Sequence, residues 1–235
     1  EIVAQVQRVN QLIREIASQR DEDFQKHFLG MHFFNPPRYL KLLEVIPTPK
    51  TSPAVIEAMS VFGEETLGKG PVLCKDTPNF IANRFASAAG AFEVAYAIDH
   101  GYTVAEIDAL CGPLIGRPKT AVFRLLDLIG LDIMAHVNSN LYAAIEGDES
   151  RELLHHEKMV TLMQTMLDKG WLGNKARQGF YKRVGSDFHI LDLNTLEYVP
   201  STKVRFESVG ANRKIEATGA RIKAMVEATD RAGEY

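Results

Sequence analysis

The string Gly30-Met31-His32-Phe33-Phe34-Asn35-Pro36-Pro37, followed by Leu42-Leu43-Glu44-Val45-Ile46, is the most informative part of this 235-residue chain. Both strings contain an apolar run typical of a strand, and the Pro-Pro pair between them favours a turn. Two strands joined there can place His32 beside Glu44. Histidine accepts and releases a proton near neutral pH, and a carboxylate on its other ring nitrogen fixes the tautomer. The pair is therefore a candidate general base and its partner.

The composition restricts only the broad class of protein and its possible partners. The formal net charge of −3 and the pI near 6.2 argue against a nucleic-acid partner. No apolar run is long enough for a membrane span, and the histidines show no metal-ligand spacing. Two cysteines, Cys74 and Cys111, are too few for a disulfide framework and are expected to be packed thiols. We therefore expect a cytoplasmic protein without a metal.

The pattern predicts a mixed first region over residues 1–77. Helical spacing of apolar residues runs from about 2 to 16, ahead of the two strands. Ser52-Pro53 starts a helix that should run to about Leu67, with Gly68 as its stop. A short strand follows at 72–74, and Thr77-Pro78 marks the boundary to the next region.

From Asn79 onward the chain is predicted to be mainly helical. A long apolar face runs to Ile98 and ends at Gly101. The further helices expected in this region span 103–110, 119–129, 133–145 and 156–169. Beyond it, a hairpin is expected from 188–191 and 196–199, and an amphipathic helix from 215–226.

Asn83 is a third candidate, because an amide is a poor helix former and costly to bury unpaired on so apolar a helix. It could donate to a substrate carbonyl or to the histidine ring, or it could be a cap or an interhelical hydrogen bond. His32 could equally be a buried structural histidine, and Glu44 a surface charge. The residue types alone leave these alternatives open.

Several strings, taken together, resemble the L-3-hydroxyacyl-CoA dehydrogenase family. The resemblance runs in order from about Phe28 to Tyr181. Besides the two opening strings, the matching segments are Lys75-Asp76-Thr77-Pro78-Asn79-Phe80-Ile81-Ala82-Asn83-Arg84, Gly112-Pro113-Leu114-Ile115-Gly116-Arg117-Pro118-Lys119 and Asp127-Leu128-Ile129-Gly130-Leu131-Asp132.

The resemblance implies NAD-dependent oxidation of an L-3-hydroxyacyl-CoA to a 3-oxoacyl-CoA, as in fatty-acid β-oxidation. By motif, His32 would be the base, Glu44 its partner, Asn83 the amide that positions substrate, and Asn35 a residue beside the nicotinamide. The implied fold is a remnant of a Rossmann-type α/β domain followed by an all-α domain, mainly α overall. The helical domain would also supply a homodimer contact.

The resemblance also predicts three segments. Residues 1–77 would be the carboxyl-terminal portion of the NAD-binding domain, 78–183 the helical domain, and 184–235 a hairpin and the start of a further helical segment. The glycine-rich phosphate turn and the acidic ribose ligand are missing from the sequence. The family's Ser-Asn-Thr-Ser string is also missing, and residues 9–14 stand roughly in its place. We therefore expect a piece of a longer protein that alone binds NAD poorly and is inactive.

The segment after the helical domain resembles larger bacterial enzymes, which repeat that domain and often carry a fused enoyl-CoA hydratase. Two alternatives to this function stay open. One is a non-catalytic helical oligomerisation module, and the other is a related dehydrogenase acting on a small 3-hydroxy acid.

Overall fold

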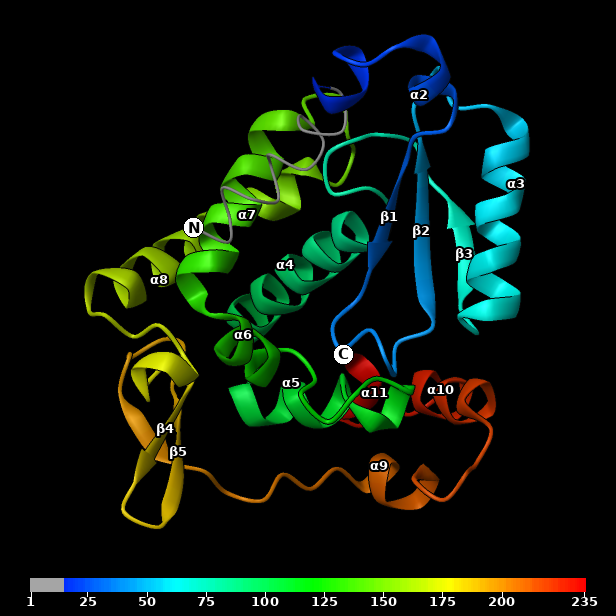
Figure 1. Cartoon of the computed structure of the whole chain (residues 1–235). Helices are drawn as coiled ribbons and strands as arrows, with labels where there is room; N and C mark the ends of the chain where they lie inside the picture. Colours follow the sequence, from blue (N-terminus) through cyan, green and yellow to red (C-terminus); the bar gives the residue numbers. More distant parts are fainter. Residues whose placement is uncertain (1–14) are drawn as a thin grey trace. The chain divides into compact units, whose positions relative to one another are not determined.

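The computed structural model describes residues 15–235 (Figure 1). The helix expected over 2–16 and the string at 9–14 therefore lie almost wholly outside the described residues. Contacts divide the chain into two units: unit 1 comprises Glu1–Ser87 and Ala143–Ile145, and unit 2 comprises Ala88–Tyr142 and Glu146–Tyr235. Unit 1 is a small α/β structure and unit 2 is mainly helical, so the expected sequence of fold types is confirmed.

A three-stranded sheet forms the centre of unit 1. After the short helix α2 (Glu22–Lys26), strand β1 (Leu29–Phe33) pairs antiparallel with β2 (Leu42–Pro47). Strand β3 (Gly70–Leu73) then pairs parallel with β2, which gives the order β1-β2-β3. The central strand is the most buried, with Leu43 and Val45 fully enclosed. Both strands expected at the opening strings are present.

Helix α3 (Pro53–Val61) makes the crossover between the parallel strands and packs along the sheet (Figure 1). Ser52 caps it by accepting a hydrogen bond from the Val55 amide. The predicted last α-helical turn is instead a π turn over Phe62–Thr66, where a Cβ on Gly63 would lie 2.8 Å from Leu43 Cδ2. Gly68 then ends the helix in a left-handed conformation at φ 62°, as predicted.

The long helix α4 (Ala82–His100) begins three residues later than the apolar pattern predicted. Asn79 and Phe80 are not helical, because both have positive φ, at 58° and 50°. The helix ends before Gly101, as expected, at a φ of 66°.

Two helices of unit 2 are capped by acidic side chains. Helix α5 (Val104–Leu110) carries a capping box between Thr103 and Glu106. Helix α6 (Phe123–Ile129) begins four residues later than predicted, because the Asp108 carboxylate accepts the amides of residues 122–124. The remaining predicted helices are α7 (Leu131–Ala144) and α8 (Glu157–Asp168), near their expected bounds.

A second sheet in unit 2 has three antiparallel strands rather than the predicted two. Strands β5 (Asp187–Leu191) and β6 (Tyr198–Pro200) form the expected hairpin. Strand β4 (Tyr181–Val184), which the pattern missed, pairs with β5. Asp127 of α6 holds the entry to β4 by accepting the amides of Phe180 and Tyr181, both at 2.8 Å.

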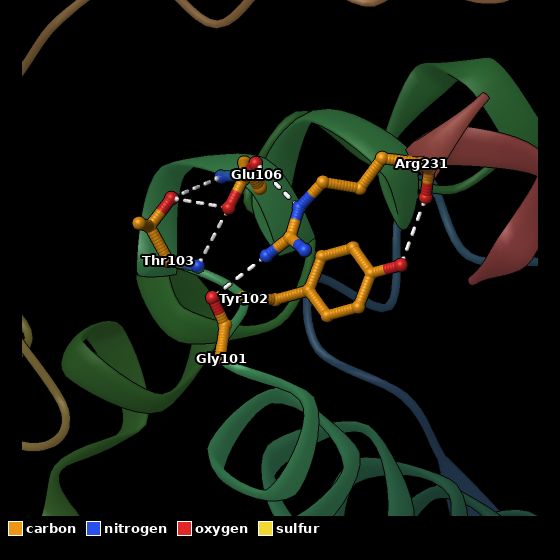
Figure 2. Close-up of polar contacts among 5 residues, drawn as sticks. All are labelled: Gly101, Tyr102, Thr103, Glu106 and Arg231. Carbon is orange, nitrogen blue, oxygen red and sulfur yellow. Dashed lines mark hydrogen bonds and ion pairs between the residues drawn. The ribbon is translucent and has the colours of Figure 1, made fainter.

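The last part of the chain forms α9 (Glu207–Asn212), α10 (Thr218–Val226) and α11 (Arg231–Glu234), where the pattern predicted one helix over 215–226. Figure 2 shows how α11 is held to α5. Arg231 donates to the Glu106 carboxylate at 3.1 Å and to the Gly101 carbonyl at 2.7 Å, and it lies 3.9 Å over the Tyr102 ring. The Tyr102 hydroxyl in turn donates to the Arg231 carbonyl.

Within residues 15–235, no helix has both the length and the apolar character required to cross a lipid bilayer. Cys74 and Cys111 are free and buried, as expected.

Candidate active site

The register of β1 and β2 brings the two opening residues together. His32 and Glu44 are directly opposed in the antiparallel pair, and His32 Nδ1 lies 2.7 Å from Glu44 Oε2. Opposed side chains of such a pair point to the same face of the sheet. A carboxylate only accepts hydrogen bonds, so a neutral His32 donates from Nδ1 and keeps a lone pair on Nε2. This arrangement leaves Nε2 able to take a proton.

Glu44 is a buried carboxylate with hydrogen bonds on both oxygens. Its side chain is 1% exposed. Oε1 accepts the amides of Ile81 at 3.1 Å and Ala82 at 2.8 Å, where α4 begins. Buried charge is costly unless it is paired, and the first amides of a helix favour a negative group. The start of α4 therefore holds the Glu44 carboxylate in place beside His32.

The imidazole of His32 is held between two aromatic rings but remains accessible. Its ring centroid is 4.7 Å from that of Phe34 and 5.5 Å from that of Phe80. The His32 side chain is 30% exposed, so a ligand can reach it. The ring is fixed by its neighbours and open on part of its surface, as a general base requires.

The nearby thiol of Cys74 is unsuited to act as a nucleophile. Burial, followed by the negative charge of Glu44, raises the pKa of Cys74 to about 11. Cys74 packs with Ile46 and Phe80 in the core of unit 1. It is a packed thiol, as the sequence indicated.

The two asparagines lie at different places. Asn83 is the second residue of α4, directly after the Ala82 amide that Glu44 binds, and it is partly exposed. Asn35 is exposed in the loop that follows β1. The structure thus joins His32 to Glu44 by a direct contact, and places Asn83 one residue from the amides bound to the same carboxylate.

Sequence reasoning missed the main-chain amides of Ile81 and Ala82 and the ring of Phe80. The only local signal was Asn79, a residue type that enters the left-handed region more readily than most, directly after Thr77-Pro78. That signal marks a turn, but it does not identify a distant carboxylate as the partner.

Comparison with known proteins identifies the family of the chain. Residues 10–77 match the model of the 3-hydroxyacyl-CoA dehydrogenase NAD binding domain, and residues 80–183 match that of the 3-hydroxyacyl-CoA dehydrogenase C-terminal domain. The chain belongs to the 3-hydroxyacyl-CoA dehydrogenase family.

Individual members of the 3-hydroxyacyl-CoA dehydrogenase family give the same result. A probable 3-hydroxyacyl-CoA dehydrogenase of Bacillus subtilis is 48% identical over 94% of the chain, which spans 28% of that protein. One from Deinococcus radiodurans is 47% identical over 70% of the chain, which spans 46% of it. The crystal structure of (S)-3-hydroxybutyryl-CoA dehydrogenase from Ralstonia eutropha superposes with a TM-score of 0.55 at 28% identity, over 71% of the chain and 55% of that structure. The chain therefore spans only part of each relative.

The family's cofactor is NAD. The His32 side chain is partly exposed and Asn35 is exposed, so a bound ligand can reach both. Residues 15–235 contain no glycine-rich turn of the kind that cradles a pyrophosphate.

Proposed function

We propose that this chain carries the proton-transfer half of an NAD-dependent L-3-hydroxyacyl-CoA dehydrogenase active site. The observation that carries the proposal is the 2.7 Å contact between His32 Nδ1 and the buried carboxylate of Glu44. A histidine held in one tautomer by a carboxylate, with its other nitrogen open, is suited to remove a proton from a hydroxyl group.

The mechanism follows from this pair. Nε2 of His32 takes the proton of the substrate's 3-hydroxyl, and Glu44 stabilises the imidazolium that forms. NAD, when bound, supplies the acceptor for the hydride that leaves the same carbon. Because the amides of Ile81 and Ala82 hold Glu44, the carboxylate needs little rearrangement as the positive charge develops.

We assign supporting roles to the two asparagines. Asn83, at the start of α4, would donate to the substrate carbonyl or hydroxyl oxygen and orient the reacting carbon. Asn35, exposed after β1, would lie beside the nicotinamide. Both roles rest on the family motif together with position: Asn35 follows the strand that carries His32, and Asn83 follows the amides that bind Glu44.

The proposal extends to the organisation of the protein. Residues 1–77 would be the carboxyl-terminal portion of the NAD-binding domain, 78–183 the helical domain and 184–235 a further segment. The substrate would be an acyl-CoA, and the helical domain would form a homodimer. Two free, buried cysteines suit a reducing compartment, so we place the protein in the cytoplasm.

The test is NADH formation by the full protein from L-3-hydroxybutyryl-CoA and, separately, from free 3-hydroxybutyrate. We expect turnover of the CoA ester, and a fall in kcat of about 10²–10⁴-fold in His32→Ala, as expected for loss of a general base. His27→Ala, an exposed histidine of the same unit, is the matched control and should keep wild-type turnover.

Each other outcome identifies a different function. Unchanged turnover in His32→Ala would overturn the base assignment. Turnover of the free acid alone would indicate a dehydrogenase of small 3-hydroxy acids. The absence of turnover with either compound would favour a non-catalytic helical module.

A further inference from the structure

The bend between β3 and α4 has an unusual backbone. Asn79 and Phe80 are consecutive residues with positive φ, at 58° and 50°. Asparagine tolerates this region better than most residues, but a bulky aromatic residue such as Phe80 seldom occupies it, because its Cβ crowds the backbone. Strain of this kind persists only where the surrounding structure holds it, and it is most common at functional sites.

The bend determines where two main-chain donors point. Immediately after it, the amides of Ile81 and Ala82 meet Oε1 of Glu44, the residue that contacts His32 through its other oxygen. The first amides of a helix have no partner within the helix, so they can donate to a side chain. The left-handed pair sets the start of the helix at Ala82 and so places these amides at the carboxylate.

The side chain at the bend contacts the other member of the pair. The Phe80 ring is 5.5 Å from the His32 ring, at an interplanar angle of 49°. Phe80 is itself only 7% exposed and packs with Ile46 and Cys74 in the core. One strained residue thus touches the imidazole through its ring and begins the segment that binds Glu44.

We propose that Phe80 is a positioning residue for the base, and that the left-handed pair Asn79–Phe80 serves to hold both His32 and Glu44 in place. The proposal rests on the proposed function, because it assigns a role within the same site. Its distinctive claim is that Phe80 keeps Nδ1 of His32 on the Glu44 carboxylate, which sets the tautomer, and does not merely stabilise unit 1.

The first experiment measures the ring nitrogens of His32 by ¹⁵N NMR in wild type, Phe80→Leu and Phe80→Tyr, under conditions where the ring is neutral. We expect a single tautomer protonated on Nδ1 in wild type and in Phe80→Tyr, and a mixture in Phe80→Leu. Phe180→Leu, which truncates a fully buried phenylalanine of unit 2, is the matched control. It should lower stability and leave the His32 spectrum unchanged.

The second experiment tests the bend through substitutions at one position. Asn79→Gly accepts positive φ without strain, so the amides of Ile81 and Ala82 should remain protected from hydrogen exchange. Asn79→Val places a β-branched residue where it is disfavoured, and exchange at both amides should accelerate by about tenfold or more. Equal protection in the two variants would overturn the role of the bend.

The kinetic measurement separates this proposal from the assigned reaction. In an active protein, Phe80→Leu should lower kcat by about tenfold and leave KM within about twofold, because positioning of the base matters most in the transition state. If wild type shows no turnover, the proposed function fails while the NMR and exchange results still decide the role of Phe80. A single tautomer and a wild-type kcat in Phe80→Leu would overturn that role. If Phe80→Leu does not fold, the comparison of Asn79→Gly with Asn79→Val decides.

Discussion

His32 Nδ1 and Glu44 Oε2 are 2.7 Å apart on directly opposed positions of β1 and β2. We therefore expect Glu44→Gln to lower kcat by about 10²–10⁴-fold with little change in KM. A glutamine oxygen can still accept the amides of Ile81 and Ala82, but its NH₂ group would face Nδ1 and favour the wrong tautomer of the imidazole. Steady-state kinetics should show this loss, and the exposed Glu65→Gln should behave as wild type. A kcat within about twofold of wild type would rule out Glu44 as the partner of the base.

Asn83→Ala should affect catalysis more than folding. Asn83 is partly exposed on the first turn of α4, and alanine is a good helix former, so the free energy of unfolding should change by less than about 1 kcal/mol. Loss of one hydrogen bond to the substrate should lower kcat/KM by about 10–100-fold. Urea denaturation and kinetics measure the two quantities. Gln164→Ala removes an exposed amide from α8 and serves as the control, and equal kinetics in both variants would remove Asn83 from the site.

Asp127 should make the stability of the protein depend on pH. Burial outweighs the hydrogen bonds from Phe180 and Tyr181 and raises the pKa of Asp127 from 3.8 to about 6. The folded state then binds more protons than the unfolded state between about pH 4 and 6, so the contribution of this group falls as pH rises through that window. The loss is at most about 3 kcal/mol.

The measurement for Asp127 is urea denaturation across this pH window. Asp127→Asn should be less stable at the acidic end, because its NH₂ group cannot accept an amide hydrogen bond, and its stability should depend less on pH. Exposed Asp187→Asn should retain the wild-type dependence. Parallel pH curves for wild type and Asp127→Asn would contradict the assignment.

Arg231→Ala should destabilise unit 2. It removes the ion pair with Glu106, the bond to the Gly101 carbonyl and the stacking on Tyr102 (Figure 2). Partly exposed contacts of these kinds suggest a loss of about 1–3 kcal/mol in the free energy of unfolding. Arg231→Lys should recover only part of it, since an ammonium cannot reproduce the planar stacking. Exposed Arg213→Ala is the control, and an equal loss there would show that the contacts of Arg231 contribute nothing specific.

The sequence was most informative where one short segment determined the structure. The strands around His32 and Glu44, the Ser52 cap and the stop at Gly68 all formed as predicted, because each depends on residues within a few positions. The contact between His32 and Glu44 also followed from the local turn that joins their strands.

Prediction failed where a distant side chain determines an element's start. Helix α4 begins late because Asn79 and Phe80 have positive φ, and the amides that follow them bind Glu44, far earlier in the chain. Helix α6 begins late because Asp108, on α5, takes the amides at its start, those of residues 122–124. Apolar periodicity describes a helix face but does not report such capping. Strand β4 was missed for a related reason, since Asp127 organises its first residues from another helix.

The hydrogen bonds of Glu44 couple the first turn of α4 electrostatically to the protonation of His32. During turnover the His32 ring, bound to Oε2 of Glu44, would alternate between neutral and positively charged. Oε1 would keep its hydrogen bonds from the amides of Ile81 and Ala82. Each protonation of His32 would draw electron density of the carboxylate toward Oε2 and make Oε1 a weaker acceptor for those amides. The residue that follows them is Asn83, so a change of charge on His32 would be felt at the first turn of the helix that carries this asparagine.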